Sequence, residues 1–183
     1  MTKLLNKNKL WCSYIVVLFV IICRSVQIEG QNCRTTGYFR ASSPPSGQCT
    51  SNCCVQNTVY FTFQCSPSVT SQTPGILSLR SFQNNQSKCD NVYHFDKSMV
   101  VGLSTGWYDG GSRCGKVIVI SGNGKTVKAK VVDECDSTKG CEAEEGYHPP
   151  CGYNIVAASK AVWKALGVPQ SQLGQLNITW ADT

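Results

Sequence analysis

Histidine and methionine are almost missing from this sequence, with two residues of each among 183, and charged residues make up only 15% of it. It contains no GxxxxGKS/T phosphate-binding loop, no GxGxxG fingerprint and no HExxH motif. These absences argue against the commonest nucleotide-binding, dehydrogenase and zinc-protease classes. Apolar residues reach 42%, which is enough for a core, so we expect one ordinary domain or two small ones.

Residues 1–30 resemble a secretory leader. Lys3, Lys7 and Lys9 precede an apolar run over residues 11–23, and a polar exit follows. A basic start, a short apolar run and a small residue such as Gly30 at the cut are typical of a cleaved signal peptide. A membrane anchor is the alternative, but the run is shorter than the roughly 20 residues that span a bilayer. We therefore predict a secreted protein that has no membrane attachment after cleavage.

The mature chain carries little net charge. Removing residues 1–30 takes away four of the 17 basic residues and one of the 11 acidic residues, which leaves a formal charge of +3. This value is too small to predict a nucleic acid or another polyanion as partner.

Ten cysteines remain after cleavage, and an even number in an exported chain predicts up to five disulfides. Their spacing does not select one pairing. Zinc is the competing interpretation for the first cysteines, but the chain has no CxxC motif and its two histidines lie far from them. We predict disulfides, with no metal and no cofactor, at Cys33, Cys49, Cys53, Cys54, Cys65, Cys89, Cys114, Cys135, Cys141 and Cys151.

The chain also contains two Asn-x-Ser/Thr sequons, which can carry N-linked glycans in a secreted protein. Asn85 lies in a polar stretch that suits a glycan acceptor. Asn177 lies in an alternating, strand-like segment, where a glycan fits only if the side chain points outward.

Most periodic segments read as strands. Alternating or β-branched runs occupy residues 59–63, 75–79, 99–103, 116–120, 126–132 and 176–180. One helix is predicted over 155–166, because apolar residues recur there at three- and four-residue steps before Gly167 and Pro169. We expect residues 31–91 to form cysteine-rich loops and β-segments packed on a barrel, and residues 92–183 to form the barrel core.

Several motifs resemble the kiwellin, or ripening-related, protein family of plants. The similarity runs through nearly all of residues 33–181 and keeps the motifs in order. They are LSTGWYDGGSRCGK at 103–116, VVDECD at 131–136, Gly140-Cys141, Pro149-Pro150-Cys151, the segments 154–156 and 161–167, and PSVTS at 67–71.

The resemblance implies a mainly β fold, a disulfide-linked six-stranded double-psi β-barrel with a short late helix, shared with barwin and the first domain of expansins. Longer kiwellins carry an additional cysteine-rich module at the N-terminus, and expansins a second sugar-binding domain after the barrel. We expect a bare barrel here.

The candidate catalytic residues are carboxylates, because glycoside hydrolysis usually needs two of them. Asp133 ends a strand where related barrels often hold an acid, and Asp109 on a glycine-rich loop is the next candidate. At the position that holds the second acid in expansin-like barrels, our alignment places Ala157. An alanine cannot transfer a proton, so we expect a protein that is not an enzyme.

Each candidate also has a structural interpretation. Asp133 could line a binding groove or accept backbone N–H bonds and fix a loop. Trp107 and Tyr108 could stack on sugars, anchor a protein interface or fill the core. Trp163 and Trp180 are assigned to the core. An acidic loop could be a solvated surface or could dock a basic partner; it contains Glu134, Asp136, Glu142, Glu144 and Glu145.

Two functions follow. The resemblance implies a secreted defence or ripening protein that binds and inhibits another protein, since kiwellins include inhibitors of a chorismate mutase secreted by a fungal pathogen. The alternative is expansin-like binding or weak cleavage of cell-wall polysaccharide.

Overall fold

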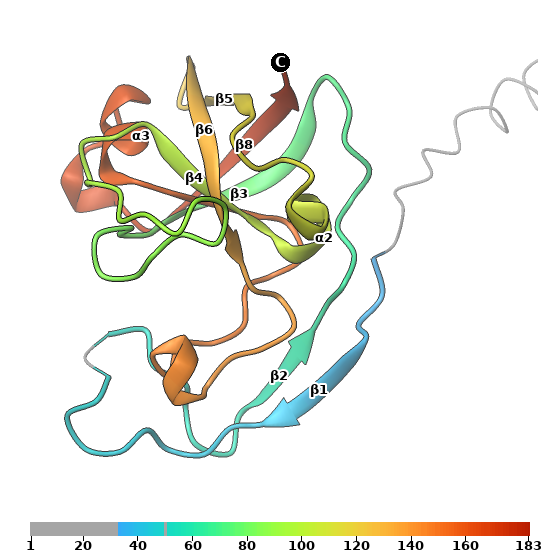
Figure 1. Cartoon of the computed structure of the whole chain (residues 1–183), viewed down its shortest axis with the longest axis vertical. Coiled ribbons are helices and arrows are strands. Elements are labelled where there is room, and N and C mark those ends of the chain that lie inside the picture. Colours follow the sequence, from blue (N-terminus) through green and yellow to red (C-terminus); the bar gives the residue numbers. More distant parts are fainter. Residues whose placement is uncertain (1–32, 50) are drawn as a thin grey trace, which may run out of the picture. The chain divides into compact units, whose positions relative to one another are not determined.

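The barrel uses six strands that come from both halves of the described chain (Figure 1). A computed structural model describes residues 33–49 and 51–183, so the predicted leader at 1–30 lies outside it. The closed barrel has the order β3-β7-β4-β6-β5-β8. The strands are β3 (Thr73–Leu79), β4 (Val100–Ser104), β5 (Val117–Gly122), β6 (Lys125–Cys135), β7 (Ile155–Ala158) and β8 (Gln175–Asp182).

Two of the strand pairs are parallel, β3 with β7 and β4 with β6, and the other four are antiparallel. This arrangement confirms the predicted mainly β, six-stranded closed barrel. Because β3 is one of its strands, the barrel begins before residue 92. Closure leaves no free strand edge in the barrel.

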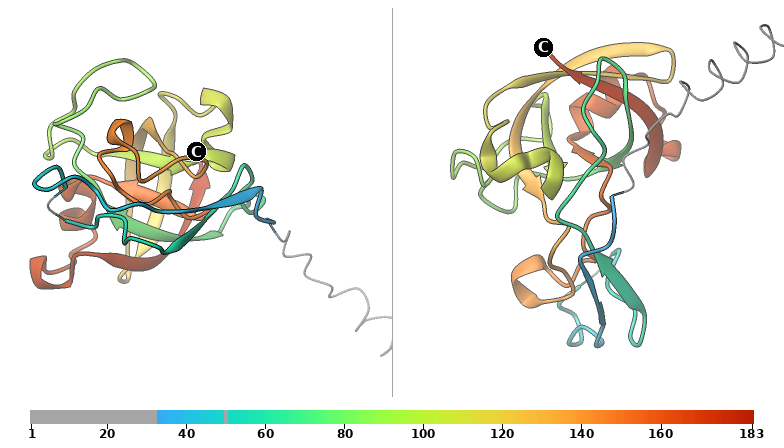
Figure 2. Two further views of the ribbon diagram at one scale, coloured as in Figure 1. Left: turned by 90° about the horizontal axis from the view of Figure 1, so that it is seen from below. Right: turned by 90° about the vertical axis from the view of Figure 1, so that its right-hand side faces the viewer.

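A separate ribbon pairs β1 (Gly37–Arg40) with β2 (Val59–Thr62) in antiparallel register. Figure 2 shows this ribbon projecting from the barrel together with the turn that contains the 3₁₀ helix η2 (Ala143–Glu145). The sequence predicted β2 but gave no signal for β1, since Gly37–Arg40 lies in a polar region that lacks clear periodicity. The main chain also forms η3 (Gln170–Gln172) before β8.

The predicted helix over 155–166 is wrong at its start. Residues Ile155–Ala158 form β7 and only Lys160–Ala165 form helix α3. All four β7 residues are buried, because Val156 and Ala158 face the main core while Ile155 and Ala157 pack in a second cluster beside Cys135 and Cys151. A strand buried on both faces shows no alternation, so its apolar residues matched a helical spacing by chance.

The core lies inside the barrel and under α3. It is built from aliphatic side chains of every barrel strand together with three fully buried tryptophans, Trp107, Trp163 and Trp180. The assignment of Trp163 and Trp180 to the core is confirmed.

Five disulfides use all ten cysteines between Cys33 and Cys151, which confirms that part of the prediction. They join Cys33–Cys65, Cys49–Cys53, Cys54–Cys141, Cys89–Cys114 and Cys135–Cys151. Within residues 33–49 and 51–183, no helix is long and apolar enough to cross a bilayer.

Candidate functional site

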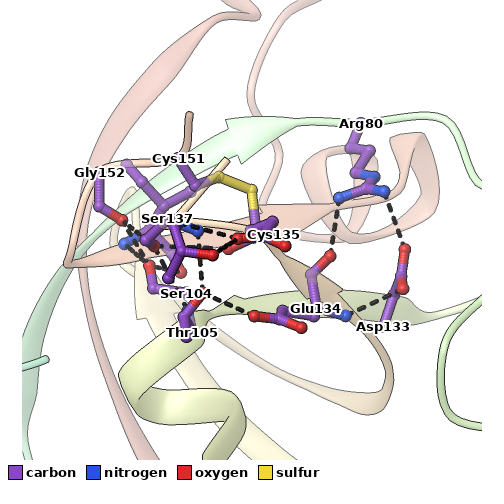
Figure 3. The surroundings of a disulfide bond; sticks show 12 residues. Arg80, Ser104, Thr105, Asp133, Glu134, Cys135, Ser137, Cys151 and Gly152 are labelled. Atoms are coloured by element: carbon purple, nitrogen blue, oxygen red, sulfur yellow. Dashed lines mark hydrogen bonds and ion pairs between the residues drawn. A yellow bond between two sulfur atoms is a disulfide. The ribbon is translucent and has the colours of Figure 1, made fainter. Parts of the chain in front are cut away.

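Asp133 lies near the end of β6 with its carboxylate almost fully buried (Figure 3). One oxygen is 2.9 Å from the Arg80 guanidinium, and the other accepts hydrogen bonds from the backbone N–H groups of Lys88 and Glu134 at 2.9 Å each. A carboxylate engaged by a cation and two amides fixes the chain around it. This geometry matches the loop-fixing interpretation of Asp133.

Glu134 and Asp136 are bound in the same network. The Lys88 ammonium lies 2.9 Å from Glu134 and 3.3 Å from Asp136. The Thr105 hydroxyl donates to the second oxygen of Glu134 at 2.6 Å, and Arg80 donates to the Glu134 carbonyl. These two acids of the predicted loop are therefore structural, and they neutralise Lys88.

The network shifts the pKa of its members. Burial alone would raise the pKa of Asp136, but hydrogen bonds from Thr138 and the Lys88 ammonium together hold that pKa below its ordinary value of 3.8. Burial likewise lowers the pKa of Lys88, yet Glu134 and Asp136 raise it above the ordinary 10.5.

These shifts predict how stability depends on pH. A carboxyl with a lowered folded pKa stabilises the fold above its ordinary pKa, and this contribution is lost as pH falls through the folded pKa. Lys88 contributes below pH 10.5 and loses its contribution as pH rises through its raised pKa. We expect the urea concentration at the midpoint of unfolding to decrease at pH values below about 4. It should decrease again in strong alkali. D136N should weaken the acid dependence, whereas the exposed change E144Q should leave it unaltered.

The strand residues in register with Asp133 include no second acid. Gly102 on β4 is paired with Asp133 on β6 and with Ala157 on β7, so the three residues form one row over three strands. Ala157 is paired in turn with Ser78 on β3 and is 1% exposed. The row therefore offers one carboxylate, already bound to Arg80, and no partner for a two-carboxylate hydrolysis.

The other predicted groove residues do not gather around Asp133. Trp107, on the short helix α2 (Thr105–Tyr108), is buried, packs edge-to-face on Trp180 and donates its indole N–H to the Pro67 carbonyl. Its side chain belongs to the core. Burial and the charge of Glu134 raise the pKa of Tyr108.

Asp109 opens the 3₁₀ helix η1 (Asp109–Gly111) with a left-handed backbone and accepts from the Ser112 hydroxyl at 2.7 Å. Neither Asp109 nor Tyr108 lies in the wall of the cavity described next.

A cavity of about 620 Å³ opens beside the Cys135–Cys151 disulfide. Its wall contains Ala157 and Asp136, together with Glu144 and Glu145 from the η2 turn. The groove is thus lined by part of the predicted acidic loop, whereas the four residues predicted to line it lie outside its wall.

The η2 turn carries three acids without an ion pair to any described residue. Glu142, Glu144 and Glu145 make no ion pair within the described part of the chain. The Cys54–Cys141 disulfide and a hydrogen bond from the Cys54 amide to the Tyr147 carbonyl hold this turn in place. We call Glu142, Glu144 and Glu145 the acidic turn.

The sequence also contains a hydrolase-type motif that was not predicted as a site. Residues Gly102–Gly106 match GxSxG and span the end of β4 and the start of α2, the strand-to-helix setting of a hydrolase nucleophile. Ser104 is fully buried, however, and its hydroxyl is engaged by the backbone of Gly152 and Ile155. The hydroxyl fixes the start of β7 and has no histidine among its hydrogen-bond partners.

The two sequons differ in their surroundings. Asn177 is exposed on β8, so its side chain points outward as a glycan requires. Asn85 is also exposed and lies in the wall of the large cavity. Ser87 of that sequon is buried, and its hydroxyl finds no hydrogen-bond partner. Both sites stay predictions. Among residues 33–49 and 51–183, no cluster of three His, Cys, Asp or Glu side chains could hold a metal ion.

Comparison with known proteins decides the family. The sequence matches the family described as Kiwellin-1 over residues 20–183. The chain belongs to the kiwellin family. Within it, the chain is 40% identical to ripening-related protein 3 of Oryza sativa subsp. japonica over 168 residues, covering 85% of this chain and 77% of that protein.

It is also 50% identical to kiwellin of Actinidia chinensis var. chinensis over 126 residues, covering 66% of this chain and 59% of that relative's length. The resemblance stated from the motifs is thereby confirmed. Among solved structures, the expansin of Clavibacter michiganensis aligns over 61% of this chain and 50% of its own, with 22% identity and a TM-score of 0.47.

Proposed function

We propose that this kiwellin-family protein is a secreted, non-enzymatic binding protein that captures another protein through the acidic turn. The observation that carries the proposal is the set of unpaired carboxylates of Glu142, Glu144 and Glu145 on a turn tied down by the Cys54–Cys141 disulfide. Complementary charge accelerates encounter and sets orientation, so the partner would present a basic surface.

The disulfides favour binding over catalysis. A loop that is already fixed loses little conformational entropy when a partner docks, so more of the contact energy appears as affinity. The barrel acids, in contrast, are engaged: Asp133 by Arg80, and Glu134 and Asp136 by Lys88. All three therefore serve to hold the 80–88 segment against the end of β6.

The family resemblance suggests the first partner to test, a chorismate mutase secreted by a plant-infecting fungus. In a defence role, binding would inhibit such an enzyme outside the plant cell.

The test compares three proteins for mutase affinity and inhibition. E142Q/E144Q/E145Q removes the three charges, and Q170K/S171K/Q172K changes net charge by the same amount on the exposed η3 segment. We expect the first variant to bind about tenfold more weakly, as for three solvent-exposed charge contacts, and the second to bind within about twofold of the native protein.

Equal affinities for all three proteins would move the interface away from the acidic turn. A lack of binding to mutases from several fungi would count against the inhibitor role and favour the second candidate.

That second candidate is binding of wall polysaccharide without cleavage, and the 620 Å³ cavity is the observation that favours it. Its wall includes polar side chains that can bond sugar hydroxyls, among them Ser78, Arg80 and Lys139. Retention on insoluble cellulose that is lost in S78W, with the urea midpoint unchanged, would support it.

A further inference from the structure

Two groups of charged side chains of opposite sign, neither of which makes ion pairs, lie apart in the described chain, although its net charge is small. Glu142, Glu144 and Glu145 lie on the η2 turn, at the lower end of Figure 1. At the opposite end, the β5–β6 hairpin and the end of α3 carry five lysines that make no ion pair within residues 33–49 and 51–183. They are Lys116, Lys125, Lys128, Lys130 and Lys164, and we call them the lysine band.

The hairpin register places the centre of this band on the outer face of the barrel. Lys128 and Lys130 are exposed, whereas Ala129 between them is buried in the core. Residues two apart on a strand point the same way about 6.6–6.8 Å apart, so the two ammonium groups project side by side from the sheet.

The ends of the band are held by backbone contacts. The Asn123 side chain donates to the Leu166 carbonyl at 3.0 Å, which fixes the hairpin turn against the end of α3 near Lys164. At the other end, the Val131 amide donates to the Lys116 carbonyl and anchors Lys116 beside the hairpin.

The surrounding face has the chemistry of a sugar-binding surface. Val119 is paired with Lys128 and Ser121 with Thr126, and the hydroxyls of Ser121 and Thr126 are 2.9 Å apart. On the neighbouring β8, Thr179 is paired with Ser121. The outward positions of this face therefore alternate lysines with hydroxyls and small aliphatic groups.

We propose that the lysine band binds an acidic polysaccharide, with its ammonium groups on carboxylates and the neighbouring hydroxyls on sugar hydroxyls. A repeating polyanion matches a row of cations that have no counter-charge of their own. The outward positions of β5, β6 and β8 carry no aromatic rings. Proteins that bind single-stranded nucleic acids stack the bases on such rings, and proteins that bind membrane surfaces insert them into the lipid. The site is separate from the acidic turn and does not depend on the proposed capture of a protein.

The experiment measures retention of the secreted protein on immobilised polygalacturonate, with neutral cellulose as the control matrix. K128E/K130E is compared with R34E/K97E, which makes the same change in net charge at exposed positions outside both the lysine band and the 620 Å³ cavity. Because Asn177 lies on the adjacent β8, each protein is measured before and after enzymatic removal of N-linked glycans.

We expect the native protein to bind polygalacturonate and to be released as sodium chloride rises from about 0.05 to 0.5 M. Retention on neutral cellulose, which would come from the 620 Å³ cavity, should not depend on salt. K128E/K130E should bind about tenfold more weakly, as expected when two surface charges are reversed, with an unchanged urea midpoint. R34E/K97E should stay within about threefold of the native protein.

Three results would overturn the proposal. The native protein could fail to bind polygalacturonate at low salt. Both variants could lose affinity equally, which would mean that net charge alone acts. The protein could bind vesicles with anionic lipid but not the polysaccharide, which would assign the band to a membrane surface.

Discussion

D133N is expected to lower the free energy of unfolding by about 3 kcal/mol, because it leaves one member of a buried ion pair without its partner. The Asp133 side chain is 6% exposed and lies 2.9 Å from Arg80. An asparagine can still accept the amides of Lys88 and Glu134 through its carbonyl oxygen, but its NH₂ group would face the guanidinium. We place the value at the lower end of the range for buried pairs because Arg80 is 33% exposed.

D133A should cost about 1–2 kcal/mol more than D133N, because it also orphans the two backbone amides. The exposed substitution E144Q serves as the control and should change stability by less than about 0.5 kcal/mol. Urea denaturation of all four proteins measures these differences. If D133N unfolded at the native midpoint, the carboxylate would have no structural role and a functional one would have to be reconsidered.

Most of the barrel strands could be predicted because they leave a local signal, whereas their closure into a six-stranded barrel was predicted from the family resemblance. Lys116–Ile120 and Thr126–Val132 flank a Ser-Gly-Asn-Gly turn, and the structure forms the β5–β6 hairpin there with Asn123 and Gly124 at positive φ. The helix at 160–165 was also visible, although β7 was merged with it.

The environment of Asp133 could not be read in the same way. Its partner Arg80 comes from the end of β3 and Lys88 from the following loop, and the Lys88 amide is 45 residues away in sequence. Nothing local in Val131–Asp136 indicates that a cation will cover the carboxylate. The same holds for Trp107, whose burial depends on Trp180 and on the Pro67 carbonyl.

The positions of the charged residues in space could not be predicted from the composition. A net charge of +3 for residues 31–183 gave no reason to expect an anionic ligand. Once the fold pairs Arg80 and Lys88 with the barrel acids, the acidic turn and the β5–β6 hairpin that carries most of the lysine band lie at opposite ends of the described unit. Binding surfaces of opposite sign on one small domain would let it hold an acidic polysaccharide while its acidic turn stays free for a protein.

C54S/C141S is expected to lower the free energy of unfolding by about 4–5 kcal/mol in the chain-entropy account, because this disulfide closes a long loop. Cys54 and Cys141 are 87 residues apart. The Cys49–Cys53 disulfide spans only 4 residues, so C49S/C53S, which makes the same chemical change, should cost about 2 kcal/mol. Guanidinium denaturation under non-reducing conditions measures both.

The same pair of variants connects stability to the proposed capture. Cys141 borders the acidic turn, and its disulfide links that turn to the N-terminal segment, whereas Cys49–Cys53 closes a local loop within that segment. At a temperature where both variants remain folded, C54S/C141S should bind the fungal mutase more weakly than C49S/C53S, because the freed turn must be ordered again on docking. Equal affinities would show that the disulfide stabilises the fold without preorganising the turn, and the acidic turn would then act through its charge alone.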